Sequence, residues 1–375
     1  MPDRLPALDG YRGLAALLVV VYHAWQHASP THAGALAGTP LYLVLRSLEA
    51  GVAWFFVLSG LLLYLPFARA ALEQDGRPST RAFFAKRALR ILPLYYVAIL
   101  LVWASRYDGL AEERVDLVEH LTFTQTFSQA HVFWTIGPAW SLAVEVGFYL
   151  LLPALGALAY AACARLRTRA GRLALLAALP LIVGLASLAF KAWALWVWHA
   201  PMDRWTVWFG LPARADGFAA GMLLAVARLA GLRAPAPLRL AGLAVLGIAF
   251  ARHDAAPAWQ AFFHAASALG FALVLAPSVA RKGAEGPWER VLGSAPFSFL
   301  GAISYSVYLW HEPLMIELAK RGWLLHKGAS WLLPNSVAMV GLSVAAGWAS
   351  YRLVEAPAMR WRSRGAIRKL ELRPA

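Results

Sequence analysis

The sequence has few charged residues and almost no cysteine. Charged residues make up 15% of its 375 residues, whereas soluble domains contain about 25%. The single cysteine, Cys163, excludes an internal disulfide framework. The histidines lack a spacing typical of metal ligands, so no metal site is expected. A soluble fold of this length is also excluded, because so few polar residues could not cover its surface.

Long apolar runs take the place of the missing charge. Hydrophobic residues make up 60% of the chain and the mean hydropathy is +0.55. Several runs contain no Asp, Glu, Lys or Arg and are long enough to cross a bilayer as a helix, which takes about 20 residues. The clearest of these runs are 146–164, 173–190, 255–280 and 328–351.

These runs predict an all-α protein, a polytopic transmembrane bundle of about ten helices. We expect a single integral-membrane domain over residues 1–375, with a basic tail at about 355–375. The span at 237–252 is the weakest, because Arg239 and Arg252 leave a short apolar stretch between them, so it is short, tilted or re-entrant. The ten spans are expected near 11–27, 48–67, 91–107, 139–164, 173–198, 206–230, 237–252, 257–280, 296–319 and 331–353.

Basic residues are concentrated in alternate connections between the predicted spans. The net charge is +15, but Lys and Arg occur in short clusters between apolar runs, which argues against nucleic acid as a partner. With the N-terminus inside, 25 of the 35 Lys and Arg residues fall in cytoplasmic segments and 8 in outer ones. The positive-inside rule then places both termini in the cytoplasm. We expect a multi-pass cell-membrane protein of the bacterial inner membrane, with the lipid bilayer as partner; the sequence sets no oligomeric state.

Two connections have features of their own. Residues 69–90 are basic and interleaved with aromatic and aliphatic residues, which predicts an amphipathic helix at the cytoplasmic interface. Arg87 and Arg90 lie three residues apart and share one face of that helix, where they suit the phosphates of a ligand or, alternatively, lipid headgroups. The longest external loop is expected at 108–138.

The stretch LDGYRGLAALLVVVYH, residues 8–23, places ionisable residues in the first predicted span. Arg12 and His23 are eleven residues apart. On an α-helix this is three turns plus roughly 20°, so the two side chains share one face, about 16 Å apart along the axis. Arg12 would lie at the cytoplasmic boundary and His23 at depth, where an ionisable group is costly and is by default a functional candidate. The alternative is a structural histidine, hydrogen-bonded inside the bundle.

Two charges interrupt the sixth predicted span. Arg214 and Asp216 are two residues apart, which puts them on opposite sides of a helix, so each needs a partner on another helix. The 17 tryptophans are mostly expected in the interfacial belts, although some in the external loop could stack on sugar.

Seven segments follow one another along the chain in a fixed order. They are LDGYRGLAALLVVVYH, GVAWFFVLSGLLL, KRALRILPLYY, WSLAVEVGFYLLLP, RADGFAAGMLLA, GAISYSVYLWHEPL and YRLVEAP. Together they resemble the membrane acyltransferase-3 family over nearly the whole chain. These integral-membrane enzymes transfer acyl groups, often acetyl, from cytoplasmic acyl-CoA to hydroxyls of extracytoplasmic glycans or related acceptors. The resemblance implies the same fold and activity here.

The resemblance also implies the residues that carry the reaction. His23 is implied as the general base for the attacking hydroxyl, with Glu145 orienting it or balancing its charge. The alternative for Glu145 is a structural carboxylate paired with an arginine such as Arg214. Acyl-CoA is implied as a co-substrate and not as a tightly bound cofactor. The residues implied to bind it are Arg12, Arg87 and Arg90, and further candidate site residues are Ser59, Arg214, Tyr305 and His311.

The sequence thus predicts a membrane O-acyltransferase with a carbohydrate or glycolipid acceptor. A second interpretation is a secondary transporter or flippase in which His23, Arg214 and Glu145 form a substrate or proton path. Inverted repeats or paired broken helices would favour it, and the sequence contains neither. A purely structural scaffold would leave the buried ionisable residues unexplained.

Overall fold

The computed structural model describes residues 6–28, 36–107, 111–280, 286–323 and 332–363. These residues form helices and connecting turns, with no β-strand among them, so the predicted all-α class is confirmed. The last part of the predicted basic tail, residues 364–375, lies outside them. The long helices are α1 (Pro6–Ala28), α3 (Gly51–Glu73), α4 (Thr80–Arg106), α6 (Trp140–Ala164), α7 (Arg169–Trp196), α9 (Leu211–Leu229), α10 (Leu238–Arg252), α11 (Pro257–Ala280), α13 (Ala295–Lys320) and α14 (Leu332–Ser350).

Shorter helices connect the long ones. The α-helices among them are α2 (Pro40–Ser47), α5 (Ala111–Leu121), α8 (Trp205–Trp208), α12 (Pro287–Leu292) and α15 (Ala356–Ser363). There are also 3₁₀ turns, η1 (Leu48–Ala50), η2 (Gln125–Phe127) and η3 (Gly137–Ala139), and one π-helical turn, η5 (Tyr351–Glu355).

Each of the ten predicted spans coincides with one long helix of the described chain. Six helical stretches are long and apolar enough to cross a membrane, and they contain α3, α4, α6, α7, α11 and α14. The other four fall short because α10 has 15 residues, and because α1, α9 and α13 carry more polar residues. The protein is a multi-pass membrane protein, while a count of ten crossings and the side of each terminus stay predictions.

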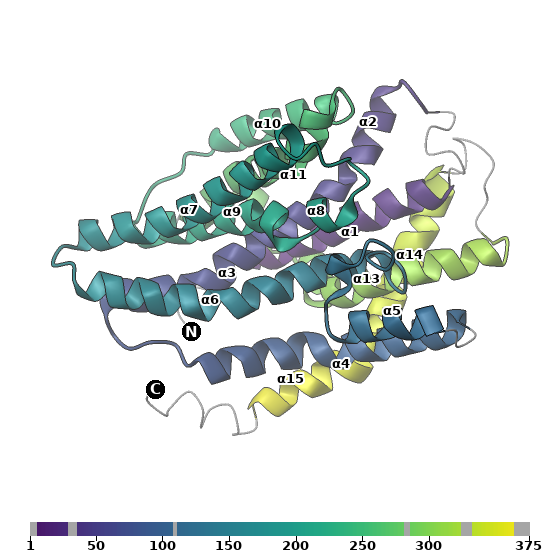
Figure 1. Cartoon of the computed structure of the whole chain (residues 1–375), viewed down its shortest axis with the longest axis horizontal. Helices are drawn as coiled ribbons and strands as arrows, with labels where there is room; N and C mark the ends of the chain where they lie inside the picture. Colours follow the sequence, from purple (N-terminus) through teal and green to yellow (C-terminus); the bar gives the residue numbers. More distant parts are fainter. Residues whose placement is uncertain (1–5, 29–35, 108–110, 281–285, 324–331, 364–375) are drawn as a thin grey trace.

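The helices run mainly along the long axis of the molecule (Figure 1). α7, α9, α10 and α11 form the upper group in this view, α4, α5 and α15 lie along the lower edge, and α1 and α3 pass between them. α1 packs against α13 and α14, and α3 packs against α9 and α6. α1, which carries Arg12 and His23, and α3, which carries Ser59, therefore lie at the centre of the bundle.

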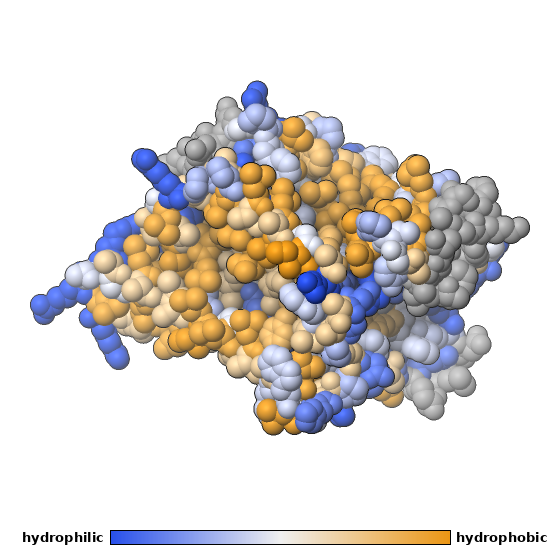
Figure 2. Space-filling model, turned by 90° about the horizontal axis from the view of Figure 1, so that it is seen from above, coloured by the Kyte–Doolittle hydropathy of each residue, from blue (hydrophilic) through white to orange (hydrophobic). Residues whose placement is uncertain are grey.

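The outside of the bundle is apolar. Hydrophobic residues cover the middle of the face in Figure 2, and hydrophilic side chains project at its left end, where Figure 1 places the turn between α6 and α7. On α7, Ile182 and Leu185 are 62% and 64% exposed. A soluble protein rarely exposes such a surface, and a bilayer covers it without cost.

The connection at 69–90 differs from its prediction. α3 continues through Arg69 to Glu73, and α4 starts at Thr80 and runs without a break to Arg106. Ser79 caps α4 by accepting a hydrogen bond from the amide of Ala82 at 3.3 Å. The prediction of a separate interfacial helix at residues 69–90 was therefore wrong. Arg87 and Arg90 instead lie in the first half of a long helix.

The expected external loop at 108–138 is largely folded. It contains α5, η2 and η3, and residues 108–110 lie outside the described chain. Asp116 is fully buried, forms an ion pair with His120 at 2.9 Å and accepts a hydrogen bond from Thr135. The Tyr95 hydroxyl donates to the carbonyl of His120 at 2.9 Å. These buried contacts fix the segment over the end of the bundle.

The contact between α3 and α9 depends on Gly221. A Cβ atom added there would lie 1.9 Å from the carbonyl oxygen of Val57, whereas one added at Gly247 of α10 would meet nothing within 4 Å. We expect Gly221→Val to lower the free energy of unfolding by at least about 1–3 kcal/mol, the usual cost of overpacking. Gly247→Val is the matched control. Thermal unfolding of the purified proteins checks this, and equal melting temperatures for both variants would contradict it.

Candidate active site

Two cavities lie beside α1, and Tyr308 of α13 lines both of them. The first, which we call the arginine cavity, has a volume of about 270 Å³. The second, which we call the histidine cavity, has a volume of about 670 Å³. His23 and Arg214 line the histidine cavity. The predicted site residues that line the arginine cavity are Arg12, Ser59, Arg87, Arg90, Glu145 and Tyr305.

The arginine cavity gathers guanidinium groups from two helices. Arg87 and Arg90 project from one face of α4, as their spacing predicts, and Arg12 comes from α1. Arg87 lies over the ring of Tyr149, with 6.0 Å between its guanidinium carbon and the ring centroid. Arg90 forms a 2.8 Å ion pair with Glu355, which is 1% exposed. The two arginines therefore differ, because within the described part of the chain a buried carboxylate pairs with Arg90 and none pairs with Arg87.

Tyr305 supports Arg90 from below. Its ring centroid lies 5.9 Å from the guanidinium carbon of Arg90, and its hydroxyl donates to the carbonyl of Ile91 at 2.8 Å. Because that hydroxyl is already bonded to the backbone, the structure gives Tyr305 the position of a support for Arg90.

Glu145 does not pair with His23 in the structure. It lines the arginine cavity, and its Oε1 accepts a 2.5 Å hydrogen bond from the hydroxyl of Ser59. The alternative pair with Arg214 is not formed either, since Arg214 lies in the histidine cavity. The pair of His23 with Glu145 was predicted because the two residues lie at similar depths along their helices, but similar depth alone does not bring side chains into contact. Because α3 packs against α6, Ser59 of α3 lies beside Glu145 and forms this hydrogen bond.

One ring nitrogen of His23 contacts two hydrogen-bond acceptors. Its Nδ1 lies 2.9 Å from the carbonyl oxygen of Val19 and 3.1 Å from Nε2 of His311. Nδ1 of His311 lies 2.5 Å from the carbonyl oxygen of Tyr308. A carbonyl oxygen only accepts, so each neutral ring carries its hydrogen on Nδ1. This leaves the lone pair of His23 on Nε2, in a residue that lines the histidine cavity.

Two residues that the sequence interpretation missed complete this cluster. Glu312, the residue after His311, lines the histidine cavity and lies 3.6 Å from Nε2 of His27. The signal that could have revealed it is an acidic residue inside an apolar span, next to a candidate histidine. Tyr308 lines both cavities, and its hydroxyl lies 2.7 Å from that of Ser141.

The two charges of α9 go to different places. Asp216 forms an ion pair with Lys191 of α7, which is 1% exposed. Arg214 turns to the histidine cavity, where its guanidinium carbon lies 5.1 Å from the ring centroid of Trp140 and 4.7 Å from that of Phe209. The prediction that they lie on opposite sides of a helix and do not neutralise each other is confirmed.

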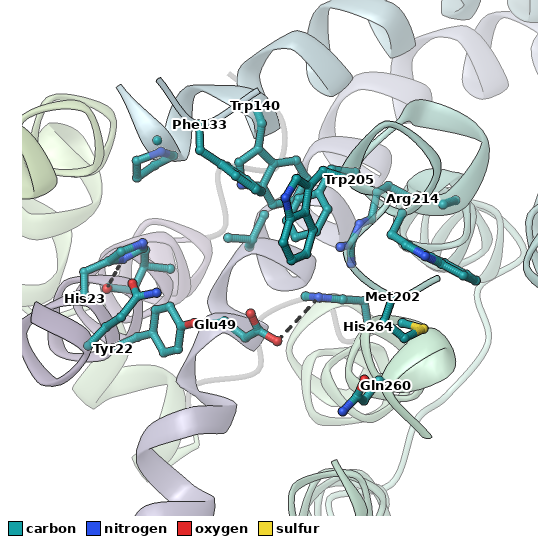
Figure 3. Close-up of a pocket in the computed structure, with 18 of the residues that line it drawn as sticks. Tyr22, His23, Glu49, Phe133, Trp140, Met202, Trp205, Arg214, Gln260 and His264 are labelled. Atoms are coloured by element: carbon teal, nitrogen blue, oxygen red, sulfur yellow. Dashed lines mark hydrogen bonds and ion pairs between the residues drawn. The ribbon is translucent and has the colours of Figure 1, made fainter. Parts of the chain in front are cut away.

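The histidine cavity has an aromatic side and a polar side (Figure 3). Phe133, Trp140 and Trp205 stand together above the cavity in this view, and His23 and Glu49 lie across from them. Together the two cavities offer clustered cations that attract phosphates and a neutral imidazole that accepts a proton.

Known proteins are similar to this sequence over most of its length. The family described as Acyltransferase domain matches residues 5–352. The chain is 28% identical to acyltransferase MdmB of Streptomyces mycarofaciens, over 95% of this chain and 92% of that protein. It is 28% identical to exopolysaccharide production protein ExoZ of Rhizobium meliloti, over 86% and 92%. It is 25% identical to peptidoglycan O-acetyltransferase OatA of Listeria monocytogenes, over 83% of this chain but 49% of that protein. No solved structure matches the chain.

Proposed function

The chain belongs to the membrane acyltransferase-3 family and is an enzyme that transfers acyl groups, and from this premise we propose its reaction. It moves an acyl group, in the simplest case acetyl, from cytoplasmic acyl-CoA to a hydroxyl of an extracytoplasmic glycan or lipid-linked sugar. The names of the relatives from Rhizobium and Listeria support an exopolysaccharide or cell-wall glycan as the acceptor. The bacterial inner membrane is the matching location.

One observation carries this proposal, namely that Tyr308 lines both a cationic cavity and a histidine cavity. Arg12 and His23 lie on the same helix, about 16 Å apart along its axis at 1.5 Å per residue. CoA has its phosphates at one end and its thioester at the other. Phosphates held in the arginine cavity on the cytoplasmic side therefore let the thioester reach towards Tyr308 and the histidine cavity.

The chemistry then needs one base. Nε2 of His23 accepts the proton of the acceptor hydroxyl while the hydroxyl oxygen attacks the thioester carbonyl. The new C–O bond forms and the C–S bond breaks, and the thiolate of CoA takes the proton from the imidazolium as it leaves. Contact with His311 keeps Nδ1 of His23 as the donor, so Nε2 is the nitrogen that takes up the proton and gives it back.

Mass spectrometry of cells with and without this protein tests the proposed function. Surface glycans, glycolipids and secreted saccharides are expected to lose one acyl group when the protein is absent. Wild-type protein should restore that group, and His23→Ala should not. Identical spectra with and without the protein would refute the assignment. The comparisons give no support to the transporter interpretation, and we do not propose it.

The arginine cavity yields a prediction that separates its two α4 arginines. Arg87→Ala should weaken acyl-CoA binding by about tenfold or more, the loss expected for a charged hydrogen bond, without lowering stability. Arg90→Ala should weaken binding and also lower the melting temperature, because Glu355 then stays buried without its cation. Calorimetric titration with acyl-CoA and thermal unfolding measure the two effects.

Arg81→Ala is the matched control for both variants, since Arg81 is an exposed arginine in the first turn of the same helix. Unchanged acyl-CoA affinity in the Arg87→Ala/Arg90→Ala double variant would return these residues to lipid-headgroup anchoring.

A further inference from the structure

Arg214 is a buried cation that forms no direct ion pair with a carboxylate of the described residues. The residue is 5% exposed, and its Nε has no hydrogen-bond partner. Among the residues that the structure describes, no carboxylate lies within ion-pair distance of its guanidinium group. It contacts the rings of Trp140 and Phe209 and lines the histidine cavity. Leaving such a donor unmatched costs free energy, so its place points to a ligand that accepts hydrogen bonds.

Glu49 provides an acceptor in the same cavity. It belongs to η1, and its Oε1 lies 3.3 Å from Nε2 of His253 and 3.7 Å from Nε2 of His264. Figure 3 shows its carboxylate turned towards the cavity, with Arg214 and His264 to one side. The cavity thus combines a fixed hydrogen-bond donor with a fixed acceptor.

Two further cations that line the histidine cavity are paired with carboxylates. Lys191 pairs with Asp216, and Arg46 pairs with Asp254 at 2.6 Å. Arg214 and Glu49 have opposite signs, so together they add no net charge. A strongly anionic ligand would meet Glu49, and a cationic one would meet Arg214. Glu312 and Asp203 also line the cavity, so its carboxylates disfavour an anionic ligand while Arg214 disfavours a cationic one, and this favours an uncharged ligand with several hydrogen-bonding groups.

The aromatic side of the cavity adds a second requirement. Trp205 and Phe133 meet edge to face with 5.5 Å between ring centroids, and Phe209 lies 4.6 Å from Trp140 in the same way. Edge-to-face packing fixes these rings and leaves flat apolar surfaces beside the polar groups. A volume of about 670 Å³ is within the roughly 300–1,000 Å³ usual for small-molecule sites.

We propose that the histidine cavity binds an uncharged sugar ring of the acceptor. The apolar face of the ring stacks on Trp205, Arg214 and Glu49 bind its hydroxyls, and a further hydroxyl faces Nε2 of His23, which lines the same cavity. This rests on the proposed function, because only an acyl acceptor has reason to approach His23. It goes further in fixing the charge of the acceptor and the side chains that select it.

Saturation-transfer NMR tests this binding without any acyl transfer. The protein is kept in a detergent without sugar headgroups, and acyl-CoA is left out. The probes are oligosaccharides of glucose, galactose and N-acetylglucosamine, together with oligomers of glucuronate. At least one neutral probe should bind, at least tenfold more tightly than the glucuronate oligomer. Arg214→Gln should weaken that binding about tenfold or more, as expected for a lost charged hydrogen bond.

Three variants make the outcome decisive. Trp205→Leu removes the stacking surface of a partly exposed residue and should also weaken binding, which keeps the test valid if Arg214→Gln fails to fold. Arg204→Gln is the matched control, because Arg204 also stacks on a tryptophan, Trp198, but does not line the cavity. His23→Ala, measured for sugar binding and for acyl transfer on the same protein, should lose far more transfer than binding, which separates this proposal from the catalytic one.

Several results would overturn the proposal. It is wrong if no neutral probe binds the wild-type protein, or if the glucuronate oligomer binds as tightly as the neutral probes. It is also wrong if folded Trp205→Leu and Arg214→Gln proteins bind sugar as well as Arg204→Gln does. Sugar binding by a wild-type protein that shows no acyl transfer would count against the proposed reaction and leave the sugar site standing.

Discussion

His23→Ala is expected to lower the acyl transfer rate by at least about 100-fold, the lower end of what a general base contributes. The variant should still insert into the membrane and still bind acyl-CoA. His23 lines the histidine cavity, whereas the residues proposed to bind acyl-CoA line the arginine cavity. The physical reason is the lone pair on Nε2, which the hydrogen bonds of Nδ1 to Val19 and His311 leave unused. No alanine can accept the proton.

The transfer rate of purified protein with labelled acyl-CoA and extracted acceptor measures this effect. His199→Asn is the matched control, because His199 is an exposed histidine outside both cavities whose positive φ asparagine tolerates. A His23→Ala rate within about tenfold of wild type would show that another group is the base.

Lys191→Met is expected to destabilise the protein by about 3–5 kcal/mol, the cost of removing one partner of a buried ion pair. Lys191 is 1% exposed and its partner Asp216 lies on the neighbouring α9. Without the ammonium group, a buried carboxylate would have to remain unpaired or be protonated. The double variant Lys191→Met/Asp216→Leu should recover most of the loss, because neither charge is then left buried.

Unfolding in a denaturing detergent, followed by circular dichroism, measures these differences. Lys320→Met is the matched control, since Lys320 pairs with Glu317 at 3.4 Å at a site where the two side chains are 53% and 37% exposed. Such a surface pair contributes about 0–1 kcal/mol. Equal losses for the two lysine variants, or a double variant no better than Lys191→Met, would show that the buried pair is not what stabilises the contact of α7 with α9.

The separation of Arg214 from Asp216 shows what the spacing of two residues on a helix can and cannot predict. Two residues apart on a helix always means different sides, so their independence follows from helix geometry alone. Their partners do not follow. Lys191 of α7 is buried and neutralises Asp216, and no local pattern names it as that partner. Which helix packs against α9 is decided by long-range contacts that no local spacing contains.

The sequence by itself determined the class of the protein, its helices and its family. Inside a bilayer every backbone polar group must be bonded internally, so an apolar run of sufficient length becomes a helix, and all ten long helices lie where the runs lie. The face shared by Arg87 and Arg90, and their common cavity with Arg12, also follow, because helical spacing and the family resemblance fix them. The prediction of an interfacial helix at residues 69–90 was wrong because Arg69 belongs to α3 and Arg90 to α4. A short connection separates the two helices, and Ser79 caps the start of α4.

Only the tertiary structure decided which side chains meet. Glu145 bonds Ser59 and not His23, while His311 comes from a helix nearly three hundred positions along the chain to fix the tautomer of His23. Tyr308 lines both cavities for the same reason. Spacing along a helix fixes direction and depth but not the neighbour across the interface, because that neighbour depends on which helices pack together and at what rotation.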